Sequence, residues 1–493
     1  MYLQSDGGDV YTDVVVVGTG PGGLAATASA VESGAQVVVI EAHDNIGGNG
    51  LLSTGWVAFV NSGLQRSVGI QDSPELFMKD CEKLLETTGK LYGLHWDREL
   101  TKLYAEESHK MYDILTSRGV RFPRLIKRPL QTSVDRLAAV EDTTMFPAAF
   151  EPEFSGPNVK TYLRCTGERI IMTGPTASGI RVQPRDGGSP FNVWASKGIV
   201  LATGGYGANP ALRRHFQVDP KDVSIFSGLG TCRGDGQLMG QAIGGDLVNM
   251  TMMPPIVRVA SHLTEEAIAV NADGNRFHDE AGPYYDRVYA LEKQRGEIGH
   301  YIFDSATFEA KKKYVLPMGG ALVKANTLSE LAAKLGVPGR AIQNSVKQWN
   351  DFLASGDLKD PKTGRVQFTP DRKAITQGPF YSKPMMVGVS LTCGGFVTTK
   401  SMQVVDVWGK PILGLFAAGD CAGGMTPTAE MGGTHLGAGF VFGWIAGKAI
   451  VTGELLAPHT KGTFGQEQPR SSANAGVGIP IVNVPAAHMK VKL

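Results

Sequence analysis

The chain is poor in cysteine, and its cysteines form no pattern that binds a metal or a haem. The 493 residues include five cysteines, namely Cys81, Cys165, Cys232, Cys393 and Cys421, and no CxxC pair. Without such a pair, or a cysteine–histidine cluster at ligand spacing, the sequence gives no sign of a zinc site, an iron–sulfur cluster or an attached haem, and we expect no metal. Scattered free thiols favour an intracellular protein over a disulfide-bonded secreted one.

The sequence also lacks an excess of charge and any long apolar run. Its formal net charge is +1, so no strong field would attract nucleic acid or an anionic membrane. No apolar run approaches the roughly 20 residues of a transmembrane helix, and the first apolar stretch, Val14–Val17, is too short for a signal peptide. We therefore expect a cytoplasmic protein that has no transmembrane segment and binds no nucleic acid.

Glycine, by contrast, is abundant, and the first glycines follow a strand pattern. Residues 12–42 read TDVVVVGTGPGGLAATASAVESGAQVVVIEA, which predicts a buried strand, a glycine turn, a helix, a second strand and an acid. Gly18 permits the tight turn, Gly20 lets the backbone approach a pyrophosphate, and Gly23 lets helix and strand pack closely. Glu41 can accept hydrogen bonds from ribose hydroxyls. This full context predicts a dinucleotide-binding site.

Two later strand ends suggest which dinucleotide is bound. Residues 196–209 (SKGIVLATGGYGAN) and 414–424 (GLFAAGDCAGG) each read as a buried strand that ends in glycines. A flavin ribityl chain needs an acid or an amide beside it, and Asp420 is placed for that role. Three such motifs spread over the chain indicate one long cofactor in a composite site.

The order of these motifs resembles that of a known family. The matching pieces are GTGPGG at 18–23, GGN at 47–49, ATGG at 202–205, GDGQLMGQAIGG at 234–245, NRFHDE at 275–280, TCGGF at 392–396, AAGD at 417–420 and GGTHLGAGFVFGWIAG at 432–447. Together they resemble the fumarate reductase/succinate dehydrogenase flavoproteins, which include the 3-ketosteroid dehydrogenases. The resemblance implies FAD, and because residues 45–56 contain no histidine for attachment, the FAD is expected to be noncovalent.

The resemblance also implies the fold and the cofactor contacts. It predicts an α/β protein whose Rossmann-like, parallel-sheet FAD domain comprises residues 1–250 and 378–456, with an inserted α+β cap at 251–377 and an extended tail at 457–493. We expect amphipathic helices within 72–118, a helical hairpin at 327–356, and a shortened strand-rich element near 163–182. The expected FAD contacts are Gly18, Gly20, Gly22, Gly23, Glu41, Gly48, Asn49, Thr203, Gly204, Asp235, Gly419, Asp420 and Gly437.

The expected substrate end departs from the fumarate reductases. Where that family places two arginines and a histidine, this chain has Tyr284, Glu430 and Leu391. A C4 dicarboxylate needs arginine forks for its two carboxylates. Fumarate or succinate is therefore a poor substrate prediction, and the pocket is expected to be apolar and phenolic.

The 3-ketosteroid dehydrogenases carry an aromatic patch that resembles HDEAGPYY at 278–285. The resemblance places the catalytic base, which removes a proton next to a ketone, at Tyr284 or Tyr285, and the oxyanion-binding glycine at Gly433. The family's second oxyanion tyrosine is Ala429 here, so His435 or the other tyrosine of the pair is a candidate substitute.

Structural roles remain open for several of these residues. The two tyrosines could pack a domain interface, His435 could orient toward flavin carbonyls or make a core hydrogen bond, and Glu430 could bond backbone instead of substrate. His278 and Glu280 are expected to be structural. His215, His262 and His300 have no visible partner and are expected at the surface.

The sequence thus predicts an FAD-dependent dehydrogenase that acts on CH–CH bonds next to the carbonyl of a cyclic or steroid-like ketone. The alternatives are a reductase of an activated C=C bond, such as that of an unsaturated acid or enone, and a non-redox flavin-dependent isomerase. Because the chain carries no haem or iron–sulfur motif, electrons are expected to pass to or from an external partner.

Overall fold

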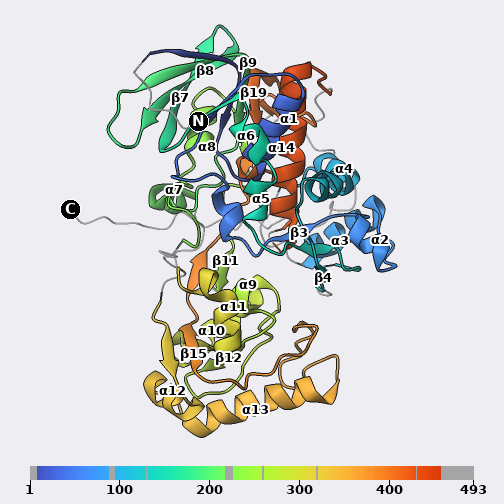
Figure 1. Ribbon diagram of the computed structural model, residues 1–493, viewed down its shortest axis with the longest axis vertical. Coiled ribbons are helices and arrows are strands. Elements are labelled where there is room, and N and C mark those ends of the chain that lie inside the picture. The colour runs from blue at the N-terminus through green and yellow to red at the C-terminus, as the bar shows by residue number, and fades with distance from the viewer. Residues whose placement is uncertain are drawn as a thin grey trace, which may run out of the picture.

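The computed structural model describes residues 8–87, 95–128, 132–216, 226–257, 260–317, 320–428 and 430–456. The predicted tail at 457–493 and Ala429 lie outside these residues. Figure 1 shows two lobes, an upper lobe that contains both ends of the described chain and a lower lobe built from the middle of the sequence. The predicted α/β class is confirmed.

A mostly parallel sheet forms the centre of the upper lobe. Its parallel strands are β6 (Val159–Tyr162), β2 (Val37–Ile40), β1 (Val10–Val17), β9 (Phe191–Leu201) and β19 (Pro411–Ala417), in that spatial order. The register sets Val17 beside Ile40 and Leu201, so the strand ends that precede the glycine motifs meet at one edge. Strand β18 (Gln403–Val405) pairs antiparallel with β19.

The strand-rich element before residue 200 is fully formed, which corrects the expectation that it is shortened. Strands β7 (Cys165–Thr173) and β8 (Thr176–Pro184) are nine residues each and form an antiparallel hairpin that continues onto β9. The turn between them contains Gly174 at a φ of +60°, a conformation that glycine adopts without strain.

Helices α1 (Pro21–Glu32) and α14 (Thr434–Thr452) pack tightly against each other on this sheet. A Cβ at Gly443 would lie 2.2 Å from the Gly22 carbonyl oxygen, and one at Gly447 would lie 2.2 Å from that of Ala26. The glycines of the GAGFVFGWIAG segment therefore let two backbones touch. Helix α14 is long and apolar enough to cross a membrane by length and composition, but 61% of its apolar window is buried in the protein.

Smaller elements surround this centre. Strands β3 (Trp56–Ala58), β5 (Leu137–Ala139) and β4 (Arg124–Ile126) form a three-stranded antiparallel sheet, beside the predicted amphipathic helices α3 (Pro74–Thr87) and α4 (Arg98–Ser117). The remaining elements of this lobe are α2 (Gly63–Ser67), α5 (Met145–Ala148), α6 (Glu151–Ser155), α7 (Pro210–Phe216), α8 (Asp235–Gln241), β10 (Leu247–Val248), β17 (Gly395–Phe396) and the 3₁₀ turns Gly48–Leu52 and Gly419–Cys421.

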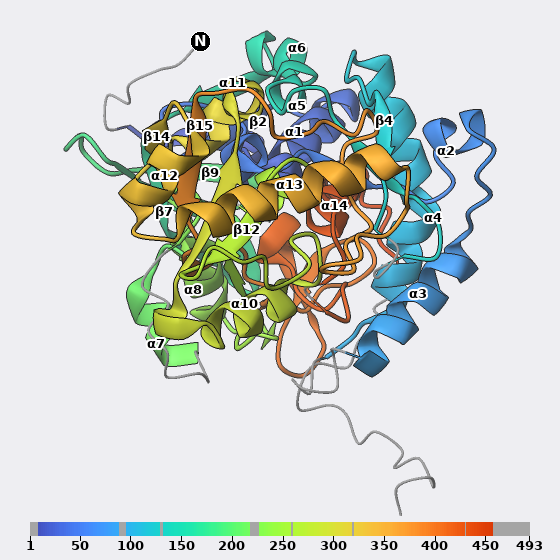
Figure 2. The ribbon, with the colours of Figure 1, turned by 90° about the horizontal axis from the view of Figure 1, so that it is seen from below.

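The lower lobe, called the cap lobe below, contains most of the segment that the resemblance assigns to a cap. Its antiparallel sheet has the order β12 (Ile268–Asn271), β13 (Gly299–Phe303), β15 (Phe380–Pro384) and β14 (Val323–Ala325). The predicted hairpin is present as α12 (Leu328–Leu335) and α13 (Gly339–Ser355), and α13 crosses the lower face (Figure 2). The other helices are α9 (Ala260–Leu263), α10 (Tyr284–Glu292) and α11 (Ser305–Val315).

The chain crosses between the lobes at two adjacent strands, β11 (Pro255–Val257) and β16 (Val387–Val389), which pair antiparallel. Two ion pairs also span the lobes. Arg124 binds Glu265 through both guanidinium Nη atoms, and Lys313 binds Asp142. These contacts hold the cap lobe against the carboxyl ends of the parallel strands, where ligands of α/β proteins bind.

Candidate active site

One elongated cavity runs from the carboxyl ends of β1, β2, β9 and β19 to the junction with the cap lobe. Of the residues predicted to contact the cofactor, the cavity is lined by Gly18, Gly20, Gly22, Glu41, Gly48, Asn49, Thr203, Gly204, Asp235, Gly419 and Asp420. Tyr284, Gly433 and His435 line it as well. The fold thus brings together segments from opposite ends of the sequence, such as those of Gly18 and His435.

The glycine turn fits a pyrophosphate. Gly18 has a φ of +100°, and a Cβ there would lie 2.3 Å from the Ala202 carbonyl oxygen. A Cβ at Gly23 would lie 1.9 Å from the Gly18 carbonyl oxygen, so Gly23 packs beneath the cavity wall. Around Gly20, by contrast, nothing lies within 4 Å of an added Cβ. This open space above the N-terminus of α1 suits an anionic group.

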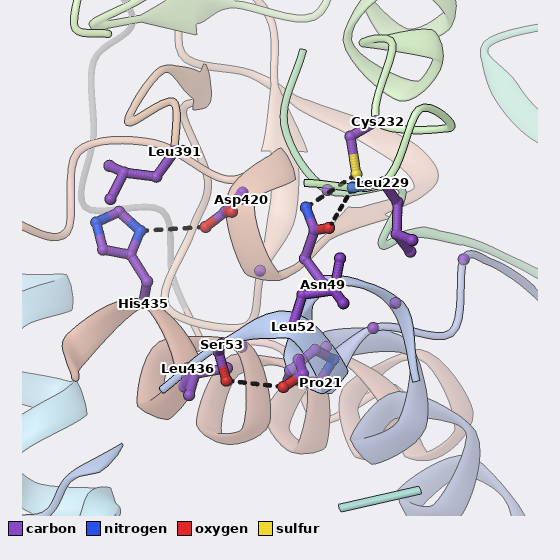
Figure 3. A pocket seen from close by; sticks show the side chains of 18 of the residues that line it. Pro21, Asn49, Leu52, Ser53, Leu229, Cys232, Leu391, Asp420, His435 and Leu436 are labelled. Atoms are coloured by element: carbon purple, nitrogen blue, oxygen red, sulfur yellow. Dashed lines mark hydrogen bonds and ion pairs between the residues drawn. The ribbon is translucent and has the colours of Figure 1, made fainter. Parts of the chain in front are cut away.

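Polar side chains along the cavity are held in place by hydrogen bonds. The buried carboxylate of Glu41 accepts the backbone N–H groups of Thr19 (2.9 Å) and His43 (2.6 Å). The Asn49 side chain accepts the Leu229 N–H at 2.8 Å and donates to the Cys232 sulfur at 3.1 Å (Figure 3). Fixed oxygens and amides of this kind suit the ribose and ribityl hydroxyls of FAD, and the residues present fit that cofactor.

His435 and Asp420 form an ion pair in the cavity. The Nδ1 atom of His435 lies 3.1 Å from an oxygen of Asp420, and its Nε2 atom lies 3.9 Å from the Cys393 sulfur. Figure 3 shows the imidazole between Asp420 and Leu391. Burial opposes the charged imidazole, but the hydrogen bonds and charges of Asp420 and Cys393 together outweigh burial and raise the pKa of His435 well above its usual value. A cationic imidazole here can hold negative charge that develops on a ligand.

Gly433 immediately precedes α14 and adopts a φ of +77°. A Cβ at this position would lie 2.8 Å from the Ala58 backbone nitrogen, so the position requires glycine. Gly437, one turn later, is not part of the cavity wall. A Cβ there would lie 2.2 Å from the Tyr104 hydroxyl, which assigns Gly437 a packing role in the protein described here.

Tyr284 and Tyr285 have different surroundings. Tyr284 lines the cavity, whereas Tyr285 does not and stacks on Tyr289, with ring centroids 6.3 Å apart. Both belong to the first turn of α10, and their backbone N–H groups donate to Glu430 at 3.1 Å and 3.3 Å. Since the first N–H groups of a helix have no partner within it, the buried Glu430 carboxylate caps α10 and sets the position of Tyr284.

The part of the cavity next to Tyr284 is mostly apolar. Apart from the predicted cofactor contacts, the residues that line the cavity include the apolar side chains of Leu52, Trp56, Ile256, Val257, Leu391, Met431 and Leu436, the ring of His262, and the hydroxyls of Ser53, Thr54 and Ser390. Among the described residues that line the cavity there is no lysine or arginine. This composition agrees with the expectation of an apolar, phenolic pocket.

His262 was expected at the surface, and that expectation is wrong. Its side chain is buried, lines the cavity and stacks on Tyr314 with ring centroids 4.4 Å apart. Burial lowers its pKa to about 3, so the ring is neutral near neutral pH. No local sequence signal marks His262, because its partners, the Tyr314 ring and the Leu52 backbone, come from distant segments.

The Glu430 cap gives a first prediction. Each Glu430 carboxylate oxygen accepts one of the two N–H groups. We expect Glu430→Gln to lower the free energy of unfolding by about 1.5–3 kcal/mol, because the amide puts an NH2 donor where one of these accepting oxygens was. Turnover should fall as well, since Tyr284 loses its support. The matched control is Asp286→Asn, which removes an exposed charge from the same helical turn. Equal effects of the two variants on thermal unfolding and turnover would contradict the capping role.

Comparison with known proteins places this site in context. A family profile described as FAD binding domain matches residues 13–436. The probable fumarate reductase Ifc3 of Shewanella frigidimarina (strain NCIMB 400) is 30% identical over 462 residues, which cover 88% of this chain and 74% of that protein. The 4-oxocyclohexanecarboxylate 2-dehydrogenase of Sinomonas cyclohexanicum is 25% identical over 540 residues, covering 89% and 92%.

Solved structures agree with the sequence comparisons. The open conformation of a flavocytochrome c3 fumarate reductase superimposes with a TM-score of 0.70 at 28% identity, covering 90% of this chain and 78% of that one. The 3-ketosteroid-Δ4-(5α)-dehydrogenase of Rhodococcus jostii RHA1, at 23% identity and a TM-score of 0.62, covers 90% of this chain and 97% of that one, and shares the fold.

Proposed function

Since the chain belongs to the FAD-binding fumarate reductase family and is an FAD-dependent oxidoreductase, we propose that it desaturates a cyclic ketone next to its carbonyl group. The observation that carries the proposal is the position of Tyr284. Its side chain lines the same cavity as the apolar side chains Trp56, Ile256 and Leu391, and the resemblance expects an arginine of the fumarate reductases at this position. A phenol beside an apolar wall suits proton removal from a ring ketone better than binding of a dicarboxylate.

In the proposed reaction, each cavity side chain has a separate role. Tyr284, as its phenolate, accepts the proton from the carbon next to the carbonyl and becomes the neutral phenol, while the electron pair of that C–H bond moves into an enolate. The Gly433 N–H and His435 hold the enolate oxygen, because a preorganised donor and a cation stabilise developing negative charge. Of the two substitutes considered for the missing oxyanion tyrosine, His435 is the one that lines the cavity. FAD, when bound, supplies the acceptor for the hydride that leaves the neighbouring carbon.

The reverse reaction is the second candidate. The Shewanella relative, at 30% identity, is named as a probable fumarate reductase, whereas the Sinomonas relative is named as a dehydrogenase of a cyclic keto acid. In a reductase, Tyr284 would donate the proton to an activated C=C bond. The same residues serve both directions because the proton and the hydride retrace one path.

Anaerobic stopped-flow absorbance of the FAD-loaded protein tests the proposal. We expect saturated cyclic ketones to bleach the oxidised flavin band, and succinate to leave it unchanged. A chemically reduced flavin that is reoxidised by enones or unsaturated acids, with no bleaching by any saturated ketone, would establish the reductase direction instead. If neither reaction occurs with any ring ketone or enone, the proposed substrate class is wrong.

A further inference from the structure

Arg128 is a buried cation whose presence the proposed reaction does not explain. Its side chain is only 4% exposed. Within the part of the chain that the structure describes, its guanidinium group makes no hydrogen bond or ion pair. A buried guanidinium without a partner is costly, and such groups concentrate at ligand sites, where the ligand supplies the missing partner.

Arg128 does not itself line the catalytic cavity, but it lies beside residues that do. The guanidinium carbon lies 5.9 Å from the centroid of the Trp56 ring. Its electrostatic neighbours include Tyr284, Arg287, Glu430 and Asp279. Trp56 and Tyr284 both line the cavity, so Arg128 sits next to the two side chains that border its apolar end.

The nearby carboxylates are committed elsewhere. The oxygens of Glu430 accept the N–H groups that begin α10, and Asp279 accepts the Ala281 N–H at 2.8 Å. The second cation, Arg287, donates through Nε to the Gly282 carbonyl oxygen at 2.7 Å, and its Nη2 atom is buried without a hydrogen-bond partner. Arg128 differs from it because no atom of its guanidinium is hydrogen-bonded within the described residues. Burial lowers the pKa of Arg128, and an anionic partner would reverse that shift.

We propose that Arg128 binds a carboxylate of the substrate, so that the enzyme acts on a ring ketone that also carries a carboxylate group. This inference rests on the proposed function and adds the substrate's charge. The arginines that the fumarate reductases place at positions 284 and 430 are absent here. Arg128, two residues after β4, supplies a guanidinium from a different element, and it holds one carboxylate where that family holds two.

One substrate could contact Arg128 at one end and the Gly433–His435 pair at the other. A planar guanidinium can hold a carboxylate by two parallel hydrogen bonds, which fixes both position and orientation. With the carboxylate at Arg128 and the carbonyl oxygen at Gly433 and His435, the ring between them lies against the apolar wall. Arg128 transfers no proton; it determines which ketones are held with the reactive C–H bond toward Tyr284.

The test compares a keto acid with its neutral ester in the FAD-loaded protein. The probes are 4-oxocyclohexanecarboxylate and its methyl ester, and the dissociation constants are measured anaerobically from perturbation of the flavin spectrum and from thermal shift. We expect the wild-type protein to bind the acid about 100-fold more tightly than the ester, and Arg128→Met to abolish this preference while leaving ester binding unchanged. Arg124→Met, which removes an arginine of the same segment that is paired with Glu265, should keep the preference.

The unfolding temperature distinguishes a binding role of Arg128 from a structural role, because the two roles predict changes of opposite sign. Without ligand, Arg128→Met should unfold at the same or a higher temperature, because it removes an unpaired buried charge. A lower unfolding temperature, with equal losses for acid and ester, would make Arg128 a structural residue and overturn the proposal. So would equal binding of acid and ester, or binding of neither, by the wild-type protein.

Tyr284→Phe separates this inference from the proposed function. That variant should keep the preference for the acid but lose flavin bleaching. If no ketone bleaches the flavin of the wild-type protein while the acid still binds through Arg128, the proposed reaction fails and the anion site stands.

Discussion

Replacing Tyr284 with phenylalanine should lower the rate of substrate-dependent flavin reduction by roughly 100- to 10,000-fold, which is the range for loss of a general acid or base. The hydroxyl is the only group removed, and the Glu430 cap contacts the Tyr284 backbone, so the helix should keep its position. FAD binding and the unfolding temperature should stay near those of the wild-type protein. Single-turnover absorbance at the flavin band measures the rate directly.

The neighbouring tyrosine is the matched control. Tyr285→Phe removes the same hydroxyl from the same helical turn, but Tyr285 does not line the cavity and stacks on Tyr289. We expect its rate to stay within a few-fold of wild type. A large loss in Tyr285→Phe together with a small loss in Tyr284→Phe would show that the base has been assigned to the wrong phenol.

The largest loss of stability is expected from Glu280→Gln in the cap lobe. The buried Glu280 carboxylate accepts two hydrogen bonds from Arg276, both at 2.9 Å, and one from Arg365 at 3.3 Å. Both guanidinium groups are fully buried, and they flank the ring of Trp349 at 5.0 Å and 4.2 Å. Neutralising Glu280 leaves an excess of buried positive charge, which typically costs about 3–5 kcal/mol.

Thermal unfolding and limited proteolysis of the cap lobe measure this effect. The control is Asp351→Asn, which breaks the exposed Lys347–Asp351 pair on α13 and should cost less than about 1 kcal/mol. Equal stability of the two variants would mean that the buried network tolerates the loss of its central carboxylate. It would also remove the structural explanation of the NRFHDE motif.

The same carboxylate should make the cap lobe sensitive to acid. Burial alone would raise the pKa of Glu280, but the guanidinium groups of Arg276 and Arg365 outweigh burial and lower it to about 2. Because the folded-state pKa lies below the unfolded value of about 4.3, the contribution of Glu280 to stability is complete above that value. It is lost as the pH falls toward 2. Glu280→Gln should flatten this part of the stability profile.

Features carried by short sequence segments could be predicted. The strand, glycine turn and acid of residues 12–42 are a local pattern, and the structure places Gly18, Gly20 and Glu41 along one cavity. The hairpin α12–α13 follows from helical periodicity and the Gly-Val-Pro-Gly break. The length of strands β7 and β8 was underestimated, because their residues show no clear alternation of apolar and polar side chains, the pattern that marks a half-buried strand.

The sequence by itself determined the family, the cofactor and the order of the elements, because glycine positions and apolar periodicity act within a few residues. Only the tertiary structure decided which of two adjacent tyrosines faces the cavity, since helix α10 points successive side chains in different directions. It also decided that Glu430 caps that helix, that His262 is buried and that Arg128 is buried beside Trp56. Each of these depends on contacts between segments far apart in the chain, and burial and charge pairing arise only once those segments have packed together.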